Sequence, residues 1–160
     1  MYLAAIILLL AVLPVLSILV EFVTTTGAGL LPLVGKWFVF WAGGVRLFLA
    51  GLSQVFRPQF TYGGIFNIKD PEAGKLVKEI GFGNLSMGLV SLFTIIVPDW
   101  IVPAALATGL YHLLAGIQHW LNGVRGTKET VALVSDLAVG VILLLFVLLT
   151  VFSTRQTIAA

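Results

Sequence analysis

The feature that most constrains this chain is a succession of long apolar runs within only 160 residues. A transmembrane helix needs about 20 mostly apolar residues to cross the hydrocarbon core of a bilayer. Because the runs reach that length, the sequence predicts an all-α, polytopic membrane helix bundle that forms one integral membrane domain, residues 1–160. The expected transmembrane helices are five, at residues 2–22, 37–56, 79–97, 100–120 and 131–152.

Composition supports lipid as the solvent of this chain. Hydrophobic residues make up 59% of it and charged residues 10%, whereas about a quarter of a soluble domain is charged. The net charge of +2 is small, and no basic patch indicates a nucleic-acid partner. The chain has no cysteine, which excludes disulfides, thiolate metal sites and cysteine catalysis. We therefore expect a multi-pass protein of the cell membrane, with membrane lipids as its surroundings.

Several local signals set the expected helix ends. The first run lacks a basic leader and a cleavage site, so we expect a retained helix, with a kink at Pro14. Turn residues in 23–36 should end it. The run Asp70-Pro71-Glu72 is typical of a helix start, which predicts that the third helix begins near residue 71 in water. On that helix, Lys75 and Glu79 are spaced to form an ion pair.

The distribution of basic residues predicts the orientation. Five spans place the two termini on opposite sides of the membrane, and cytoplasmic loops carry the excess of lysine and arginine. The side of the C-terminus holds Lys36 and Arg155, and the side of the N-terminus holds Arg57, Lys69, Lys75, Lys78, Arg125 and Lys128. This bias predicts a cytoplasmic N-terminus and an external C-terminus.

Polar and ionisable residues inside the spans form the candidate site. They are Arg46, Glu79, Asn84, His112, His119 and Asp136. All but Arg46 fall in the expected cytoplasmic half, and Arg46 can extend toward that half. An unpaired arginine at mid-bilayer costs about 2.5–3.5 kcal/mol on insertion scales. Arg46 should therefore be paired, with Asp136 as first choice and Glu79 as second.

Glycine stripes accompany these residues. The third span carries Gly81 and Gly88 on the face of Asn84, and the fourth carries Gly109 and Gly116 on the face of its histidines. Small residues at this spacing let membrane helices approach closely. The tight turn between the two spans makes them antiparallel. We therefore expect Gly81 to pack against Gly116 and Gly88 against Gly109.

The same register places Asn84 opposite His112 and Glu79 opposite His119, which leaves two interpretations open. The first is a set of interhelical hydrogen bonds, each worth about 0.6–2 kcal/mol, that lock the bundle. The second is a pathway for ions, protons or a small ligand, since intramembrane ionisable groups are functional candidates. The two histidines are about 10.5 Å apart along the helix, too far to share one metal ion. We expect no metal site and no catalytic residues.

One stretch resembles a known family. The residues Glu79-Ile80-Gly81 followed by Asn84-Leu85 and Gly88 resemble the E-I-G-x-x-N-L-x-x-G signature of an uncharacterised family of small bacterial and archaeal membrane proteins. A histidine-bearing helix and a last helix with Asp136 follow in the same order. More distantly, the pattern is similar to DoxX-type four-helix proteins, some of which associate with membrane oxidoreductases. The first resemblance implies a fold and no function.

Three hypotheses on function follow. The leading one is a non-catalytic subunit of a membrane complex, or a homo-oligomer, whose polar residues form an internal lock. The second is a small transporter, channel or proton-handling protein that uses those residues. The third, which depends on the DoxX-like resemblance, is a redox partner linked to quinone or lipid. Enzymatic activity is not indicated, and no cofactor can be named.

Overall fold

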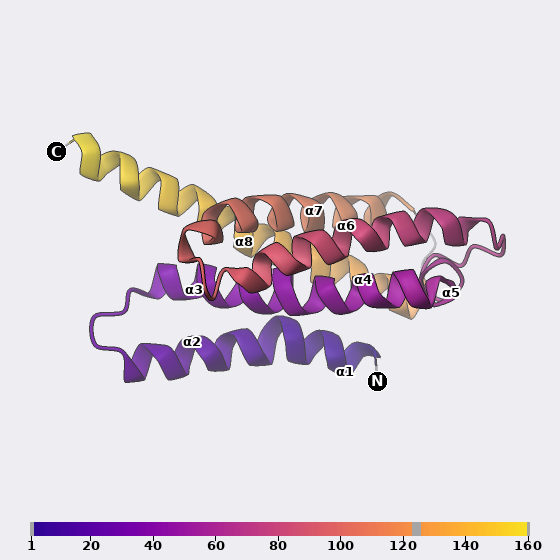
Figure 1. Ribbon diagram of the computed structural model, residues 1–160, viewed down its shortest axis with the longest axis horizontal. Helices are drawn as coiled ribbons and strands as arrows, with labels where there is room; N and C mark the ends of the chain where they lie inside the picture. The colour runs from indigo at the N-terminus through magenta and orange to yellow at the C-terminus, as the bar shows by residue number, and fades with distance from the viewer. Residues whose placement is uncertain (1, 123–125, 160) are drawn as a thin grey trace.

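The computed structural model describes residues 2–122 and 126–159, and it confirms the all-α membrane bundle (Figure 1). The described residues form helices and turns, with no strand among them. Five helical segments are long and apolar enough to cross a membrane. These segments are Leu3–Thr24, Leu30–Phe56, Ala73–Phe93, Pro98–Leu121 and Thr127–Gln156.

The first span contains a π-helical stretch. It consists of α1 (Tyr2–Ile7), the π-helix η1 (Leu8–Val12) and α2 (Leu13–Thr24). The stretch ends two residues before Pro14, which has no backbone N–H and whose ring clashes with the carbonyl one turn earlier. The wider turn of a π-helix relieves that clash. The structure therefore accommodates Pro14 with a π-helical stretch, where the sequence predicted a kink.

The second span begins at Leu30, seven residues before the expected start at residue 37. It is continuous through α3 (Leu30–Phe38), the π-helix η2 (Val39–Arg46) and α4 (Leu47–Phe56). Only the segment 25–29 connects it to the first span. Pro32 falls within the segment 23–36 that was expected to be a connection, but it lies in the first turn of α3. A proline is tolerated there, because its missing N–H costs nothing in the first turn of a helix.

The third span starts close to the expected place. After the short helix α5 (Pro58–Tyr62), α6 runs over Ala73–Phe93. A carboxylate oxygen of Asp70 accepts a hydrogen bond of 2.9 Å from the backbone N–H of Glu72, which fixes the turn that leads into α6. The expected Lys75–Glu79 pair is wrong, because Lys75 pairs with Glu72. Both side chains of that pair stand in an exposed first turn.

The last two spans are longer than expected. A 3₁₀ turn, η3 (Pro98–Trp100), leads into α7 (Ile101–Leu121). The final helix, α8 (Thr127–Ala159), begins four residues before the expected start and continues past its expected end. The early start places a further acidic residue, Glu129, on the helix.

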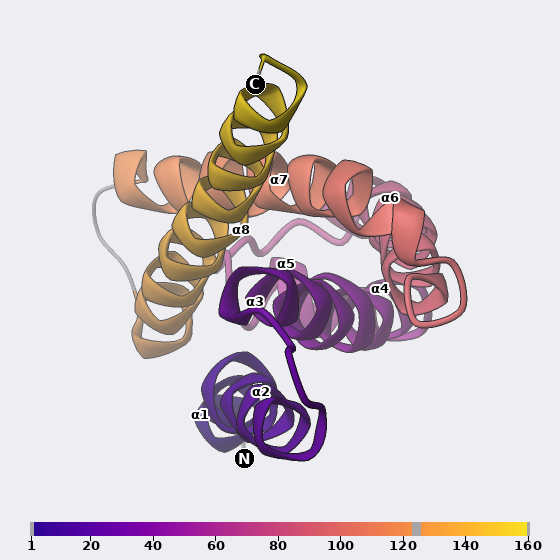
Figure 2. The ribbon, with the colours of Figure 1, turned by 90° about the vertical axis from the view of Figure 1, so that its left-hand side faces the viewer.

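The helices pack in two close pairs. α7 lies along α8, and α4 lies along α6, while α6 and α7 contact each other little beyond their connecting turn. Viewed from one end, α8 crosses the bundle and the helix of α1 and α2 lies at its edge, beside α3 (Figure 2). The segment η2 contacts both α6 and α7 and so joins the two pairs.

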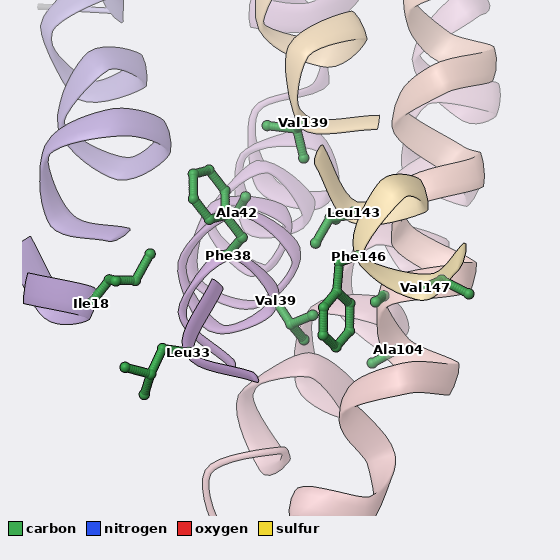
Figure 3. Close-up of a cluster of buried hydrophobic side chains, with 11 residues drawn as sticks. Ile18, Leu33, Phe38, Val39, Ala42, Ala104, Val139, Leu143, Phe146 and Val147 are labelled. Atoms are coloured by element: carbon green, nitrogen blue, oxygen red, sulfur yellow. The ribbon is translucent and has the colours of Figure 1, made fainter. Parts of the chain in front are cut away.

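An apolar cluster fills the space between α3, η2, α7 and α8 (Figure 3). Val39 and Leu143 are fully buried in it. The ring of Phe146 lies so close to Gly35 that a Cβ at that glycine would be 2.2 Å from the ring carbons. The absence of a side chain at Gly35 therefore allows α8 to approach α3.

Polar contacts attach the first span to the second. Nζ of Lys36 lies 2.7 Å from a carboxylate oxygen of Glu21, and Nε1 of Trp37 donates to the same carboxylate at 2.8 Å. Further along, Nε1 of Trp41 donates to Oγ of Ser17 at 3.0 Å. These hydrogen bonds hold a helix that shares little apolar contact with the rest of the bundle.

Candidate functional site

Arg46 and Asp136 form an ion pair inside the bundle. Arg46 ends the π-helical stretch η2, and its Nη2 donates to Oδ1 of Asp136 on α8 at 2.7 Å. The two side chains are 12% and 8% exposed. Nη2 also lies 3.4 Å from Oγ of Ser135. The expected first-choice partner of Arg46 is therefore confirmed, and the charge of Arg46 is neutralised where lipid would not solvate it.

His112 completes a three-way contact with this pair. Its Nδ1 lies 3.1 Å from Oδ1 of Asp136 and 3.1 Å from Nη1 of Arg46, and its side chain is 0% exposed. Nδ1 can donate to the carboxylate or accept from the guanidinium, but one tautomer cannot do both. Nε2 is buried with no hydrogen-bond partner in the described part of the chain.

His119 lies between two carboxylates. Its Nδ1 is 3.4 Å from Oε1 of Glu129, and its Nε2 is 3.9 Å from Oδ2 of Asp136. The same Oε1 of Glu129 accepts a hydrogen bond of 2.8 Å from Nδ2 of Asn122. The ring of Phe66 covers one side of His119, with the centroids 5.8 Å apart. His119 therefore connects the end of the bundle to the buried ion pair.

These contacts define a single group of side chains, which we name the central polar cluster. Each helix supplies its members on one face: the two histidines are seven residues apart on α7, and the two acids are seven residues apart on α8. Such a spacing returns to the same face after two turns. The members of the central polar cluster are Arg46, His112, His119, Glu129, Ser135 and Asp136.

The sequence interpretation missed two members of the central polar cluster, Ser135 and Glu129, and the more informative of them is Glu129. It was placed in a loop because α8 was expected to begin at residue 131. In the structure Glu129 is in the first turn of α8 and is 5% exposed. Its spacing from Asp136 on one helix face is the sequence signal that could have identified it.

Asn84 and Glu79 lie outside the central polar cluster, which corrects the expected pairings with the histidines. Nδ2 of Asn84 donates to Oε1 of Gln54 on α4 at 2.7 Å. Glu79 is exposed on α6 and forms no ion pair with a described residue. The histidines instead meet acids of the fifth span, Glu129 and Asp136.

The expected match of the glycine stripes is also wrong. A Cβ at Gly81 would be 2.9 Å from Cβ of Gln54, and one at Gly88 would be 2.6 Å from the backbone nitrogen of Phe48. The stripe of α6 therefore packs against α4. Its counterpart on α4 includes Gly51, whose added Cβ would be 2.8 Å from the carbonyl oxygen of Gly81.

The other stripe packs against α8. A Cβ at Gly109 would be 3.1 Å from Cβ of Leu143, and one at Gly116 would be 2.7 Å from Cδ2 of Leu137. From the opposite side, a Cβ at Gly140 would be 2.7 Å from the backbone nitrogen of Leu113. A tight turn makes two helices antiparallel but does not oblige them to pack along their length. Here each helix has a better-matched partner elsewhere.

The arrangement supports ion pairing and proton exchange more than metal binding. Within residues 2–122 and 126–159, no group of three or more histidine, aspartate or glutamate side chains is placed to hold a metal ion. The acids and histidines lie in one row, and Arg46 supplies a fixed positive charge beside it.

No protein-family model matches the chain, and no curated protein or solved structure matches it significantly.

Proposed function

We propose that this chain is a non-catalytic integral membrane subunit, acting as a homo-oligomer or with a partner subunit, and that the central polar cluster is its internal lock. One observation carries the proposal: Oδ1 of Asp136 lies within hydrogen-bonding distance of both Arg46 and His112. That single oxygen connects the second, fourth and fifth spans. Helix arrangements that separate these residues would leave a buried charge unpaired. The contact therefore favours the observed arrangement over them.

The energetics support a lock. Removing one partner of a buried ion pair costs about 3–5 kcal/mol, because the other charge is left uncompensated. Helix packing in lipid has no hydrophobic driving force between helices, so close packing of small residues and directional polar contacts together set the arrangement. Arg46 lies at the end of η2, and its hydrogen bond to Asp136 is the shortest polar contact between that segment and α8 among the described residues.

The surface position of Glu79 supports association with another chain. This carboxylate is exposed on the outside of the bundle, about 9 Å along the axis from the start of α6. A charge on a lipid-facing surface is costly unless it reaches water or a partner. A neighbouring chain that covers this part of α6 and supplies a donor would relieve that cost. The glycine stripes do not serve this purpose, because they are occupied within the chain.

A second candidate function is proton handling, and the geometry of His119 favours it. Its two ring nitrogens face two different carboxylates, Glu129 and Asp136. A neutral imidazole can accept a proton at one nitrogen and release another from the opposite nitrogen. Glu129 lies in the first turn of α8, and the row Glu129, His119, Asp136, His112 leads from there into the bundle.

Purified protein in liposomes tests the two functions against each other. A pH-sensitive dye inside the liposomes reports the decay of an imposed proton gradient, and thermal unfolding reports stability. If the cluster is a lock, the gradient should decay as in empty liposomes, and Asp136→Asn should lower the unfolding temperature. If the gradient decays faster with the native chain, and His119→Gln abolishes this without lowering the unfolding temperature, the cluster handles protons.

A further inference from the structure

At one end of the bundle α4, α5 and the start of α6 come together (Figure 1). Residues of these three helices and the links between them line an open cavity. Its volume is about 760 Å³, within the range of about 300–1,000 Å³ that ligand sites occupy. Three basic residues line it, Arg57, Lys75 and Lys78, and no acidic residue of the described chain is among its lining residues. The cavity therefore has the charge of an anion site.

Two of these positive charges are not neutralised within the described part of the chain. Lys75 pairs with Glu72, but Arg57 and Lys78 form no ion pair with a described acid. A further cation stands behind one wall, where Nζ of Lys128 lies 4.9 Å from the ring centroid of Phe60. The local excess of positive charge favours an anion with several acceptor oxygens.

The backbone around Arg57 is fixed, so that its side chain starts from a defined position. Its N–H donates to the carbonyl of Ser53 at 2.7 Å, and its carbonyl accepts from the N–H of Phe60 at 3.0 Å. On the opposite wall, a Cβ at Gly74 would be 3.5 Å from the ring of Tyr62, which shows how closely α5 approaches α6. Arg57, in the link between α4 and α5, and Lys78, on α6, both line the cavity.

The place of the cavity along the span indicates which anion it takes. It lies at the end of two membrane spans, on the side that the lysine and arginine bias assigns to the cytoplasm. The ring of Phe56, which is 76% exposed, and the ring of Phe60 form part of its wall. Tyr62 also lines the cavity, and tyrosine rings are enriched at the level of lipid headgroups. Basic pockets between transmembrane helices on the cytoplasmic side bind anionic headgroups.

From these observations we infer that this cavity binds the phosphate-bearing headgroup of an anionic phospholipid, with Arg57 and Lys78 holding the phosphate oxygens. Arginine suits this task because its planar fork matches two phosphate oxygens at once, while lysine adds a point charge. The acyl chains would leave the cavity past Phe56 toward the bilayer. This inference does not depend on the role of the central polar cluster.

Native mass spectrometry of the full chain in detergent, titrated with phosphatidylglycerol or phosphatidylcholine, tests the inference. We expect tighter binding of phosphatidylglycerol. Combining Arg57→Gln with Lys78→Gln should weaken that binding roughly 30-fold, the effect of removing two charges near the membrane surface. The matched control combines Lys69→Gln with Arg155→Gln, which removes the same charges from exposed positions outside the cavity, and it should change binding less than about threefold.

A charge-preserving variant and a free anion complete the test. Arg57→Lys combined with Lys78→Arg should keep the preference for phosphatidylglycerol, because the two positive charges remain. An unfolding temperature of the glutamine variant close to that of the native chain shows that its loss of binding does not come from misfolding. Equal binding of the two lipids, or equal losses in the cavity and control variants, would overturn the inference. The lipid assignment would also be overturned if inorganic phosphate binds while the two lipids bind alike, because the cavity would then take a free anion.

Discussion

Arg46 and Asp136 are 90 residues apart in the chain, yet their side chains meet at 2.7 Å inside the bundle. The contact joins the end of the π-helical stretch η2 to the last cluster residue of α8. His112 reaches the same carboxylate oxygen from α7 at 3.1 Å. The stability of the bundle should therefore respond strongly to changes at any of these three positions.

Replacing His112 by phenylalanine should destabilise the protein. Phenylalanine fills a similar volume but cannot bond to Asp136 or Arg46. Leaving a buried polar partner unsatisfied costs about 1–3 kcal/mol, and reversible unfolding in mixed micelles would measure this loss. His112→Gln, which keeps a donor and an acceptor, should recover part of it. Native-like stability of the phenylalanine variant would show that the His112 contact contributes nothing.

Gly116→Leu should destabilise the protein far more than Gly83→Leu, although both glycines are in transmembrane helices. A Cβ at Gly116 would be 2.7 Å from Cδ2 and 3.0 Å from the backbone nitrogen of Leu137, whereas one at Gly83 would have nothing within 4 Å. Overpacking of a close helix contact typically costs about 1–3 kcal/mol. Thermal unfolding of the two variants would measure the difference. Equal unfolding temperatures would contradict the close packing of α7 on α8.

The orientation of the chain remains a prediction from its basic residues. A reporter fused after the last residue should be external, and one fused before the first residue should be cytoplasmic. Alkaline phosphatase and green fluorescent protein fusions, which are active on opposite sides of a bacterial membrane, would measure both ends. An internal readout at the C-terminus would mean either an inverted bundle or a segment that does not cross.

Association through α6 can be tested with single cysteines, since the native chain contains none. If copies meet around Glu79, a Leu76→Cys variant, which keeps Glu79 and places the thiol at a 65% exposed position one turn away on α6, should form a disulfide-linked dimer under mild oxidation. Leu114→Cys, at a position on α7 that is 63% exposed, provides the control and should cross-link less. A monomeric mass for the native chain, with no partner protein co-purifying, would contradict the proposed subunit role.

The sequence was sufficient for the number of spans and for the Arg46–Asp136 pair, because both follow from the cost of unmatched groups in lipid. A run of about 20 apolar residues has no other stable environment, and a mid-membrane arginine must find an acid. The start of the second span was less predictable, because Pro32 is compatible with a connecting loop and with the first turn of a helix.

Lateral neighbours could not be predicted in the same way. The glycines of α6 and α7 share a spacing that suits each other, but it also suits Gly51 on α4 and Gly140 on α8. Spacing defines which face of a helix can approach another closely and does not identify the other helix. For that reason the sequence placed Asn84 beside His112, while in the structure Asn84 bonds to Gln54.

The most direct test of the lock compares Asp136→Ala, Arg46→Leu and the double variant in reversible unfolding measurements. We expect Asp136→Ala to lower the free energy of unfolding by about 3–5 kcal/mol, since it leaves the Arg46 charge buried without its partner. Adding Arg46→Leu removes that charge and should restore a substantial part of the loss, with a coupling energy of about 1 kcal/mol or more. A double variant no more stable than Asp136→Ala alone would contradict the lock.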